Sequence, residues 1–370
     1  MLSLTLFLFL VYILLLANYT YQWSRVPISL PTISKQQRRF TVLIPARNEE
    51  NNIATLLEAL QGQSYPRNLI EIIVLDDGSA DQTPTIVQQY PSVKLIRSNN
   101  QEGFGGKKQA IEAGIRSARH EWILTTDADS LPTPDWIATL DSFLERKEMV
   151  CVVGPVSMIP SGSGVLQAFQ RYDHLMFQGI TGGAVGSGQH ALGNGANLCY
   201  QKDAFESVGG FQGIDQLASG DDVLLIEKFM NRYPEQVDFL KSPPALVKTP
   251  SCPTWKSLWQ QRVRWVSKAG SYQNKQLLFT QWTTGLFNVV LLTNTLACFI
   301  WPSECKAVLA IWGFKSITEW LLIRSVATVY QERVFFLLFL LLQPIHAGYL
   351  VAVGLLGRGR TYAWKGRTVR

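Results

Sequence analysis

The chain has 370 residues, of which 47% are hydrophobic and 17% charged, and its mean hydropathy is +0.07. It is too apolar for an ordinary soluble protein and too polar for one embedded wholly in a membrane. The net charge of +6 does not indicate a nucleic-acid partner, because much of it flanks apolar segments and is typical of membrane-surface anchors. The composition therefore indicates one soluble domain joined to membrane segments.

Residues 1–22 carry no charge and are long enough to cross a hydrocarbon core, which takes about 20 helical residues. They form either an N-terminal transmembrane anchor or a cleaved signal peptide. No Lys or Arg precedes this run, whereas Lys35, Arg38 and Arg39 follow it, which favours an anchor with the next domain in the cytoplasm. We expect a multi-pass protein of the cell inner membrane.

Three further apolar stretches lie near the other end of the chain. They cover residues 283–301, 307–323 and 334–356. Lys315 and Glu319 interrupt the middle stretch, which either spans the membrane or is re-entrant or interfacial. Two full spans return the basic tail, residues 357–370, to the cytoplasm, so two spans are favoured over three.

Between the membrane segments, residues 36–270 are predicted to form one α/β domain. Short apolar runs alternate with amphipathic helices, which indicates a mostly parallel sheet covered on both faces. The expected strands are 41–46, 71–79, which runs into a turn, 93–98, and 122–129, which ends in acidic residues. The expected helices are 51–62, 83–89 and 107–118. In such sheets ligands bind beyond the carboxyl ends of the strands, where acidic clusters follow in this chain.

Asp76 and Asp77 end the second of these strands and are followed by Gly78 and Ser79. This composition is common in plain turns. Two carboxylates at the mouth of a parallel sheet can also accept hydrogen bonds from a nucleotide base and from ribose hydroxyls. Both interpretations stay open until the other motifs are considered.

Asp127 and Asp129 follow the apolar strand that begins at Trp122. The alternation of a strand would point both carboxylates to one side, where they could hold one Mg²⁺ or Mn²⁺ together with a diphosphate. The alternative is a solvated turn. Lys107 follows a glycine-rich segment, residues 103–106, that lacks the spacing of a P-loop. Its ammonium either approaches a phosphate or lies at the start of a surface helix.

Asp221 and Asp222 precede an apolar helical run. One carboxylate, poised by its neighbour, could act as general base toward an acceptor hydroxyl. The alternative is that Ser219 or Asp221 caps the helix. A further helix, predicted over about 254–270, carries Gln261, Arg264 and Trp265 on one face. These side chains either clamp a diphosphate and pack on a sugar, or anchor an interfacial helix at the membrane.

In order along the chain, these motifs resemble glycosyltransferase family 2, which includes ceramide glucosyltransferase, cellulose synthase, hyaluronan synthase and bacterial lipid or carotenoid glycosyltransferases. The segments that carry the resemblance are IPARNEE (44–50), LDDGSAD (75–81), TDAD (126–129), GDD (220–222) and QRVRW (261–265). They are similar to the successive D, DxD, (E/D)D and QxxRW signatures of that family. The resemblance covers roughly residues 40–270.

The resemblance implies a GT-A fold: an α/β domain with a mostly parallel mixed sheet, helices on both faces, and transmembrane helices at both ends of the chain. It also implies roles for individual residues. Those expected at the nucleotide-sugar and its phosphates are Pro45, Arg47, Glu49, Asp76, Asp77, Lys107 and Asp127, with Gln261, Arg264 and Trp265 closing over the diphosphate and sugar. Asp129 would hold the metal together with Asp127. Asp222 would be the base, supported by Asp221.

The function implied is inverting transfer of a sugar from a nucleotide-sugar, with UDP as the expected nucleotide, to a hydroxyl of a lipid-like membrane acceptor. A processive polysaccharide synthase is the alternative that the QxxRW motif permits. A binding or scaffold protein is disfavoured because every acidic motif is intact. Glu112 departs from the Asn common in relatives, and the glycines of 193–200 and 208–211 either lie near the acceptor or serve turns.

Overall fold

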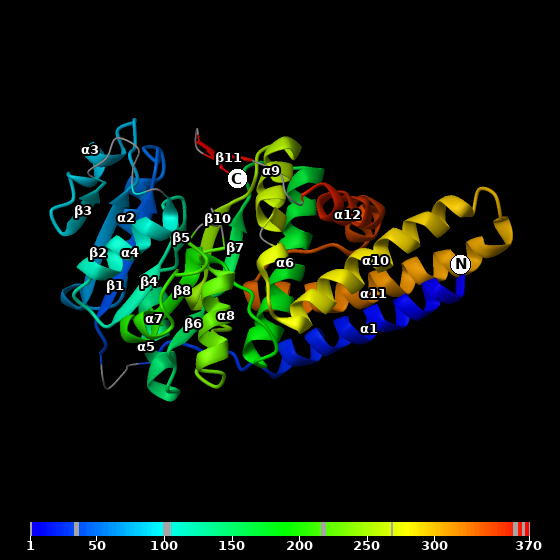
Figure 1. The fold of residues 1–370 in the computed structure, drawn as a ribbon, viewed down its shortest axis with the longest axis horizontal. Coiled ribbons are helices and arrows are strands. Elements are labelled where there is room, and N and C mark those ends of the chain that lie inside the picture. The colour runs from blue at the N-terminus through cyan, green and yellow to red at the C-terminus, as the bar shows by residue number, and fades with distance from the viewer. Residues whose placement is uncertain are drawn as a thin grey trace. The chain divides into compact units, whose positions relative to one another are not determined.

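The structure is a computed structural model, and it divides the chain into two compact units (Figure 1). It describes residues 2–32, 37–98, 104, 106–215, 220–267, 269–357, 362–364 and 367–369. The unit that we call the sheet unit comprises Val26–Ile159, Val185–Pro250 and Ala363–Arg370. The unit that we call the helical unit comprises Met1–Arg25, Pro160–Ala184 and Ser251–Tyr362. Residues 160–184 and 251–270, expected within one catalytic domain, therefore group with the helices.

The sheet unit contains a seven-stranded sheet in the order β3-β2-β1-β4-β8-β6-β9. Its strands are β1 (Phe40–Ala46), β2 (Ile70–Asp76), β3 (Val93–Arg97), β4 (Trp122–Thr125), β6 (Cys151–Val153), β8 (Leu198–Gln201) and β9 (Val237–Phe239). A smaller sheet contains β5 (Leu131–Pro132), β7 (Val156–Ile159) and β10 (Val247–Pro250). At the chain end, β11 (Tyr362–Trp364) pairs with β12 (Arg367–Val369).

The first four strands pair in parallel, as the apolar runs predicted. Ile44 lies opposite Val74, and Val42 lies opposite Leu124. β8 runs antiparallel to both β4 and β6, so the sheet is mixed. The pairing of β1 with β4 ends at Leu43, so Pro45 lies where the missing backbone N–H costs no hydrogen bond to β4.

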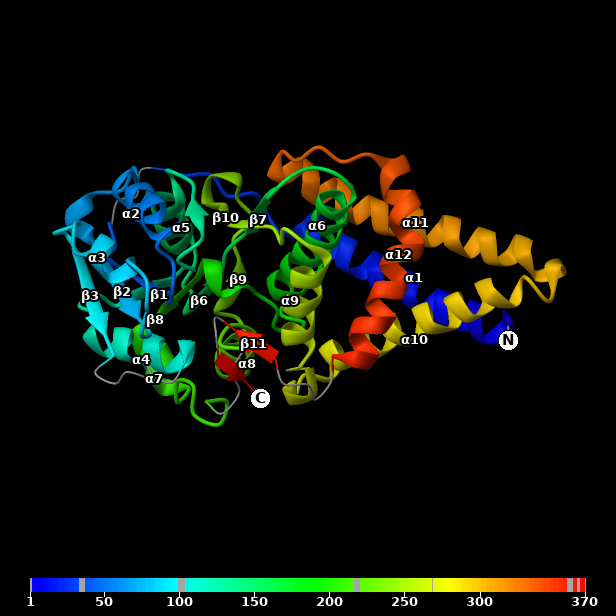
Figure 2. The same ribbon diagram turned by 90° about the horizontal axis from the view of Figure 1, so that it is seen from above.

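Helices cover both faces of the sheet, as expected (Figure 2). The helices of the sheet unit are α2 (Ile53–Gln61), α3 (Thr83–Val87), α4 (Lys107–Ser117), α5 (Trp136–Arg146), α7 (Lys202–Ser207) and α8 (Val223–Arg232). The apolar sides of α2 and α5 share a buried core with Val42, Ile44 and Val74. On the opposite face α4 packs so closely that a Cβ on Gly114 would lie 2.8 Å from a methyl of Leu75.

The helical unit consists of long helices that pack against one another. They are α1 (Leu2–Arg25), α6 (Val165–Gly186), α9 (Trp255–Ser267), α10 (Lys275–Ala297), α11 (Cys305–Tyr330) and α12 (Phe336–Leu356). The helices α1, α10 and α11 run side by side (Figures 1 and 2). Apart from Ile28 and Leu30, every exposed large hydrophobic side chain among the described residues belongs to this unit.

Polar side chains lie inside the helical unit. The buried members include Thr5, Asn288, Asn294, Lys315, Glu319 and Gln343. Lys315 pairs with Glu319 at 2.6 Å, and Gln343 of α12 contacts both, accepting from Lys315 at 2.5 Å and donating to Glu319 at 2.7 Å. Tyr12 of α1 also donates to Glu319, at 2.5 Å. This network joins α1, α11 and α12, so Lys315 and Glu319 do not simply interrupt an apolar segment.

Two helices among the described residues are long and apolar enough to cross a membrane, judged by length and composition alone. They cover Ser3–Arg25 and Phe336–Leu356. The sequence favoured two spans among the three C-terminal stretches, but only α12 meets the criterion there. Lys35, Arg358, Arg360, Lys365 and Arg370 lie outside the described residues. Arg38, expected as a membrane-surface anchor, instead pairs at 3.1 Å with the buried Asp141 of the sheet unit.

Candidate active site

Asp76 and Asp77 lie at the carboxyl end of β2, and both carboxylates are buried. Asp76 accepts a hydrogen bond from the Ser79 N–H at 3.0 Å, and its other oxygen lies 3.2 Å from the Arg97 guanidinium. Asp77 accepts from the Phe104 N–H at 2.5 Å. The turn interpretation of Asp-Asp-Gly-Ser therefore holds for Asp76, and the same turn presents Asp77 at the expected edge of the sheet.

The segment after β1 is held against the segment after β2 by side-chain bonds to backbone. Arg47 donates to the Asp77 carbonyl at 2.5 Å. Asn48, in a left-handed conformation at φ 54°, accepts from the Ala80 N–H at 2.9 Å. Glu49 is buried and accepts from the Asn52 side chain at 2.8 Å. The two motifs IPARNEE and LDDGSAD thus form one structure at the end of the parallel strands.

Lys107, at the start of α4, joins two acidic motifs that are far apart in sequence. Its ammonium lies 2.8 Å from an oxygen of Asp127 and 3.1 Å from an oxygen of Asp221. Burial disfavours the charged ammonium, but the nearby carboxylates of Asp127 and Asp221 outweigh burial and raise the pKa of Lys107. Lys107 is therefore a permanent positive charge at this edge of the sheet. Gly103 and Gly105 of the preceding segment lie outside the described residues.

Asp127 and Asp129 lie beyond β4, which ends at Thr125. The expected strand over 122–129 is thus too long, and strand alternation does not determine how the two carboxylates point. Instead the chain turns there, with the Ser130 N–H donating to the Asp127 carbonyl at 3.0 Å. Both side chains are partly exposed, as the turn alternative predicted.

Asp222 is the N-cap of α8, so the cap alternative holds for Asp222, whereas Asp221 was expected as the cap. One Asp222 oxygen accepts from the Val223 N–H at 2.7 Å, and the other accepts from the Gly195 N–H at 3.3 Å. Asp221 instead turns toward Lys107. Ser219, the other expected cap, lies outside the described residues. The two residues therefore have different contacts. Asp222 binds the backbone of two segments, whereas Asp221 belongs to a charged cluster with Lys107 and Asp127.

The glycines after α6 have two different roles. A Cβ on Gly195 would lie 3.1 Å from the Lys107 ammonium, and one on Gly193 would lie 2.4 Å from Ile226. These two glycines therefore allow close approach to the charged cluster and to α8, rather than a turn. Gly209 and Gly210 have φ values of 70° and 49°, so they do serve a turn.

Gln261, Arg264 and Trp265 lie on α9, in the helical unit, and all three are partly buried. The intervening Arg262 is the buried one. Its guanidinium lies 2.5 Å from Asp173 of α6 and 4.1 Å from the centre of the Trp265 ring. His346 of α12 lies 3.2 Å from the other Asp173 oxygen. Arg262 therefore connects the motif on α9 to two other helices.

Residues 41–209 match the family model described as Glycosyl transferase family 2. That segment is therefore similar to the family 2 glycosyl transferases. The chain is 30% identical over 237 residues to the probable glycosyltransferase YdaM of Bacillus subtilis, a match covering 62% of this chain and 55% of that protein. It is 28% identical over 254 residues to the beta-monoglucosyldiacylglycerol synthase of Synechocystis, covering 65% of this chain and 49% of that protein. The chain thus spans about half the length of these relatives.

The fold is that of the GT-A glycosyltransferases. A solved structure of the mannosyltransferase PcManGT from Pyrobaculum calidifontis, in complex with GDP-Man and Mn²⁺, has a TM-score of 0.61 to this chain. The likeness covers 96% of this chain and 98% of that one, at 19% sequence identity. The mixed sheet, the helices on both faces and the long apolar helices agree with the expected architecture.

Two acidic residues of the sheet unit fit a metal that is shared with a substrate. Within the described ranges no group of three or more His, Cys, Asp or Glu side chains could hold a metal ion alone. Mg²⁺ and similar ions commonly use only one or two carboxylates, with substrate phosphates and water completing the shell. Asp127 and Asp129, partly exposed and close in sequence, are a donor set of this kind.

Asp173, Arg262 and His346 were missed from the sequence. The signals were present: Asp173 interrupts the apolar face of α6, and Arg262 lies four residues after Leu258 on the buried face of α9. Charged residues on a buried helix face indicate a partner on another helix. The sequence pointed instead to Gln261, Arg264 and Trp265, because their spacing of i, i+3 and i+4 places them on one helical face.

Proposed function

We propose that the chain transfers a sugar from a nucleotide-sugar to a hydroxyl of a lipid acceptor at a membrane surface, with inversion at the anomeric carbon. The observation that carries this proposal is the meeting of three motifs at one ammonium. Lys107, Asp127 and Asp221 are far apart in sequence, yet both carboxylates lie within about 3 Å of one nitrogen. Buried core packing does not require such a cluster, whereas a phosphate-handling site does.

The residues around this cluster have distinct parts in the proposed reaction. Asp77, at the end of β2, accepts hydrogen bonds from the nucleoside. Lys107 carries positive charge toward the diphosphate, because its raised pKa keeps it protonated. Asp127 and Asp129 would hold Mg²⁺ or Mn²⁺, which would supply positive charge to the leaving nucleoside diphosphate.

We assign the general base to Asp222, with Asp221 in support. A carboxylate is basic enough because the acceptor proton leaves only as the oxygen attacks the anomeric carbon. The backbone bonds to Asp222 fix the orientation of its carboxylate at the start of α8. Since Asp221 is the neighbouring carboxylate, its comparison with Asp222 is part of the test.

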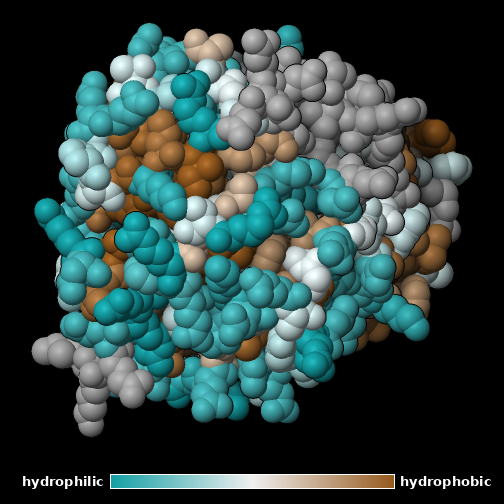
Figure 3. Space-filling model, turned by 60° about the vertical axis from the view of Figure 1, so that its left-hand side comes forward, coloured by the Kyte–Doolittle hydropathy of each residue, from teal (hydrophilic) through white to brown (hydrophobic). Residues whose placement is uncertain are grey.

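A lipid acceptor is supported by the surface of the helical unit. Many large apolar side chains are exposed on α1, α10, α11 and α12, whereas the face of the molecule visible in Figure 3 is mostly hydrophilic with smaller hydrophobic areas. Large exposed apolar areas are typical of membrane contact. The Synechocystis relative is named for a diacylglycerol product. We therefore propose that membrane and acceptor meet the helical unit.

The activity is tested with purified membranes that contain the chain. They are incubated with a panel of nucleotide-sugars, and glycosylated lipids are identified by mass spectrometry. A new glycolipid that depends on one nucleotide-sugar supports the proposal, and hydrolysis of every donor without a glycolipid contradicts it. Product length distinguishes single transfer from the processive alternative, since a processive synthase gives a polymer.

We further propose that the sheet unit faces the cytoplasm, because nucleotide-sugars are supplied there and basic residues follow the first apolar segment. Protease added to intact spheroplasts should leave the sheet unit uncut and should digest it after lysis. Digestion from outside would reverse the topology without affecting the proposed chemistry.

A further inference from the structure

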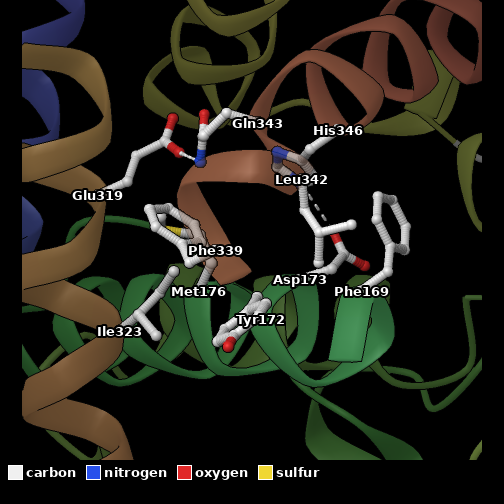
Figure 4. A pocket seen from close by; sticks show the side chains of 10 residues that line it. All are labelled: Phe169, Tyr172, Asp173, Met176, Glu319, Ile323, Phe339, Leu342, Gln343 and His346. Carbon is white, nitrogen blue, oxygen red and sulfur yellow. Dashed lines mark hydrogen bonds and ion pairs between the residues drawn. The ribbon is translucent and has the colours of Figure 1, made fainter. Parts of the chain in front are cut away.

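A cavity lies inside the helical unit. Its volume is about 170 Å³, and the lining comes from α1, α6, α10, α11 and α12. A smaller adjoining cavity shares Asp173, Glu319 and His346 with it (Figure 4). Most other lining side chains are aliphatic or aromatic, such as Leu16 and Ile180. The cavity is therefore an apolar space with a few polar groups.

The charged groups that line the cavity are carboxylates. Asp173 and Glu319 line it, whereas the cations that neutralise them, Arg262 and Lys315, do not, and within the described ranges no other Lys or Arg lines it. In Figure 4, Glu319 is bonded to Gln343, and Asp173 to His346. A phosphate in this space would meet two carboxylates in surroundings of low polarity, which is unfavourable.

His346 adds an unsatisfied group. Its Nε2 lies 3.2 Å from Asp173, and its other ring nitrogen, Nδ1, is buried with no hydrogen-bond partner among the described residues. When Nε2 donates to the carboxylate, Nδ1 keeps a lone pair. A buried acceptor of this kind is stabilised by a hydroxyl donor.

Hydroxyl groups occupy another part of the lining. Tyr19 and Thr280 lie 2.6 Å apart, and Thr284 lies one helical turn further along α10. Hydroxyls both donate and accept, so they match polyol or ester oxygens without requiring charge. The volume suits a group of moderate size, since an apolar cavity of about 150 Å³ holds a benzene ring. Glycerol with the first carbons of its acyl chains has comparable dimensions.

We infer that this cavity binds the head of an uncharged, hydroxyl-bearing lipid such as a diglyceride, rather than a lipid phosphate. The inference rests on the proposed function and narrows its acceptor class. The carboxylates and the imidazole accept hydrogen bonds from the lipid hydroxyl, and the leucine and isoleucine side chains contact the beginning of the acyl chains. The two carboxylates of the lining, with their cations outside it, disfavour an anionic head.

The test uses the full chain in detergent micelles and dioleoylglycerol that carries a diazirine on one acyl chain. After illumination, labelled peptides are mapped by mass spectrometry. We expect labels on the lining segments of α1, α6 and α12, lost on competition with unlabelled dioleoylglycerol and not with dioleoyl phosphatidate. Labels confined to exposed apolar faces, or equal competition by the phosphatidate, would overturn the inference.

Matched variants on one helix separate the cavity from the surface. Thr284→Phe fills the cavity and should lower labelling at least about tenfold, because there is no room for both groups. Thr293→Phe, at an exposed position of the same helix, should leave labelling unchanged. His346→Gln should weaken dioleoylglycerol binding about fivefold, and leave its acetylated, hydroxyl-free form unaffected. Equal labelling of both threonine variants would contradict the assignment.

Failure of this inference can be told from failure of the proposed function. Nucleotide-sugar turnover to a glycolipid is measured on the same variants. If glycolipid forms equally with Thr284→Phe and Thr293→Phe, the function stands and the cavity is not the acceptor site. If dioleoylglycerol labels the cavity but no nucleotide-sugar is consumed, the lipid-binding inference is supported and the proposed glycosyl transfer is contradicted.

Discussion

The two units of the chain distribute polar and apolar side chains in opposite ways. In the sheet unit the core is apolar and includes Val42, Ile44 and Val74, while acidic and basic groups gather at the ends of strands. In the helical unit apolar residues such as Phe7 and Leu341 are exposed, and Lys315 and Glu319 are fully buried. A unit surrounded by water and one surrounded by lipid are expected to differ in this manner.

The same contrast holds for their charged clusters. Lys107 has a side chain 22% exposed, and its partner Asp127 is 37% exposed, so a ligand can rearrange this pair. Lys315 and Glu319 are 0% and 2% exposed. Arg262 and Asp173 lie between these extremes. Burial lowers the pKa of a lysine and raises that of an aspartate, yet Arg262 and His346 overcome burial and lower the pKa of Asp173 to about 2. Exposed clusters suit chemistry, and buried ones suit assembly or the binding of uncharged ligands.

The largest effect is expected at the exposed cluster. Asp222→Asn should lower kcat by about 10²–10⁴-fold, because the amide cannot accept the acceptor proton. Asn caps helices as well as Asp, so α8 should remain folded. The measurement is kcat for glycosyl transfer together with the dissociation constant of the nucleoside diphosphate, which should change little.

Asp221→Asn is the matched control for the base. Near-normal kcat in Asp222→Asn with loss in Asp221→Asn would move the base to Asp221. Full activity in both variants would mean that neither carboxylate is the general base. Asp222 would then serve only as the N-cap of α8.

Removal of the metal should have the next largest effect. Asp129→Ala, or excess chelator with wild type, should lower transfer by about 10²–10³-fold, since charge on the leaving diphosphate is no longer neutralised. The melting temperature should stay close to wild type because Asp129 lies in a partly exposed turn. Activity is measured before and after addition of Mg²⁺ or Mn²⁺, and full activity in chelator would exclude the metal role.

The contrast between buried and exposed ion pairs can be tested by the free energy of unfolding, beginning with Lys315 and Glu319 of the helical unit. Lys315→Met removes the cation that pairs with the buried Glu319 and should cost about 3–5 kcal/mol, measured by unfolding in mixed micelles. In the sheet unit Arg119→Met breaks a pair with Glu71 in which the arginine is 77% exposed, and it should cost about 0–1 kcal/mol. Adding Glu319→Gln to Lys315→Met should recover most of the loss. Equal losses of stability in Lys315→Met and Arg119→Met would contradict the predicted difference between the buried and the exposed ion pair.

Much of the sheet unit could be predicted from the sequence. β1 to β4 follow apolar runs that only a buried parallel sheet accommodates, and the acidic residues follow those strands directly. The strand predicted over 122–129 was too long, because an apolar run indicates that a strand is present but not at which residue it ends. The chain leaves β4 at Thr125, where pairing with both β1 and β8 ends.

The assignment of helices to units could not be predicted. Nothing local in α6 or α9 distinguishes a helix that covers the sheet from one that packs on membrane helices. Their place depends on partners distant in sequence, such as Arg262 and Asp173. The different contacts of Asp221 and Asp222 likewise depend on where Lys107 and Gly195 lie in the fold. The sequence positions of the two acidic residues do not reveal this.

The smallest predicted effect concerns the glycine beside the exposed cluster. A Cβ on Gly195 would lie 3.1 Å from the Lys107 ammonium and 3.3 Å from an Asp221 oxygen. Both are ends of flexible side chains, so Gly195→Ala should shift them by tenths of an ångström and leave stability within about 0.5 kcal/mol of wild type. Since misplacement by about 1 Å can cost 10²-fold in rate, this smaller shift should lower kcat by less than about tenfold.

Gly162→Ala, in the helical unit, is the control because a Cβ there meets nothing within 4 Å. It should change neither kcat nor stability. A slower Gly195→Ala with unchanged nucleotide-sugar KM would mean that the spacing of Lys107 and Asp221 acts on the chemical step. An equal change in KM and kcat would instead assign that spacing to donor binding, and no change in either would show that the cluster tolerates the shift and that Gly195 serves packing alone.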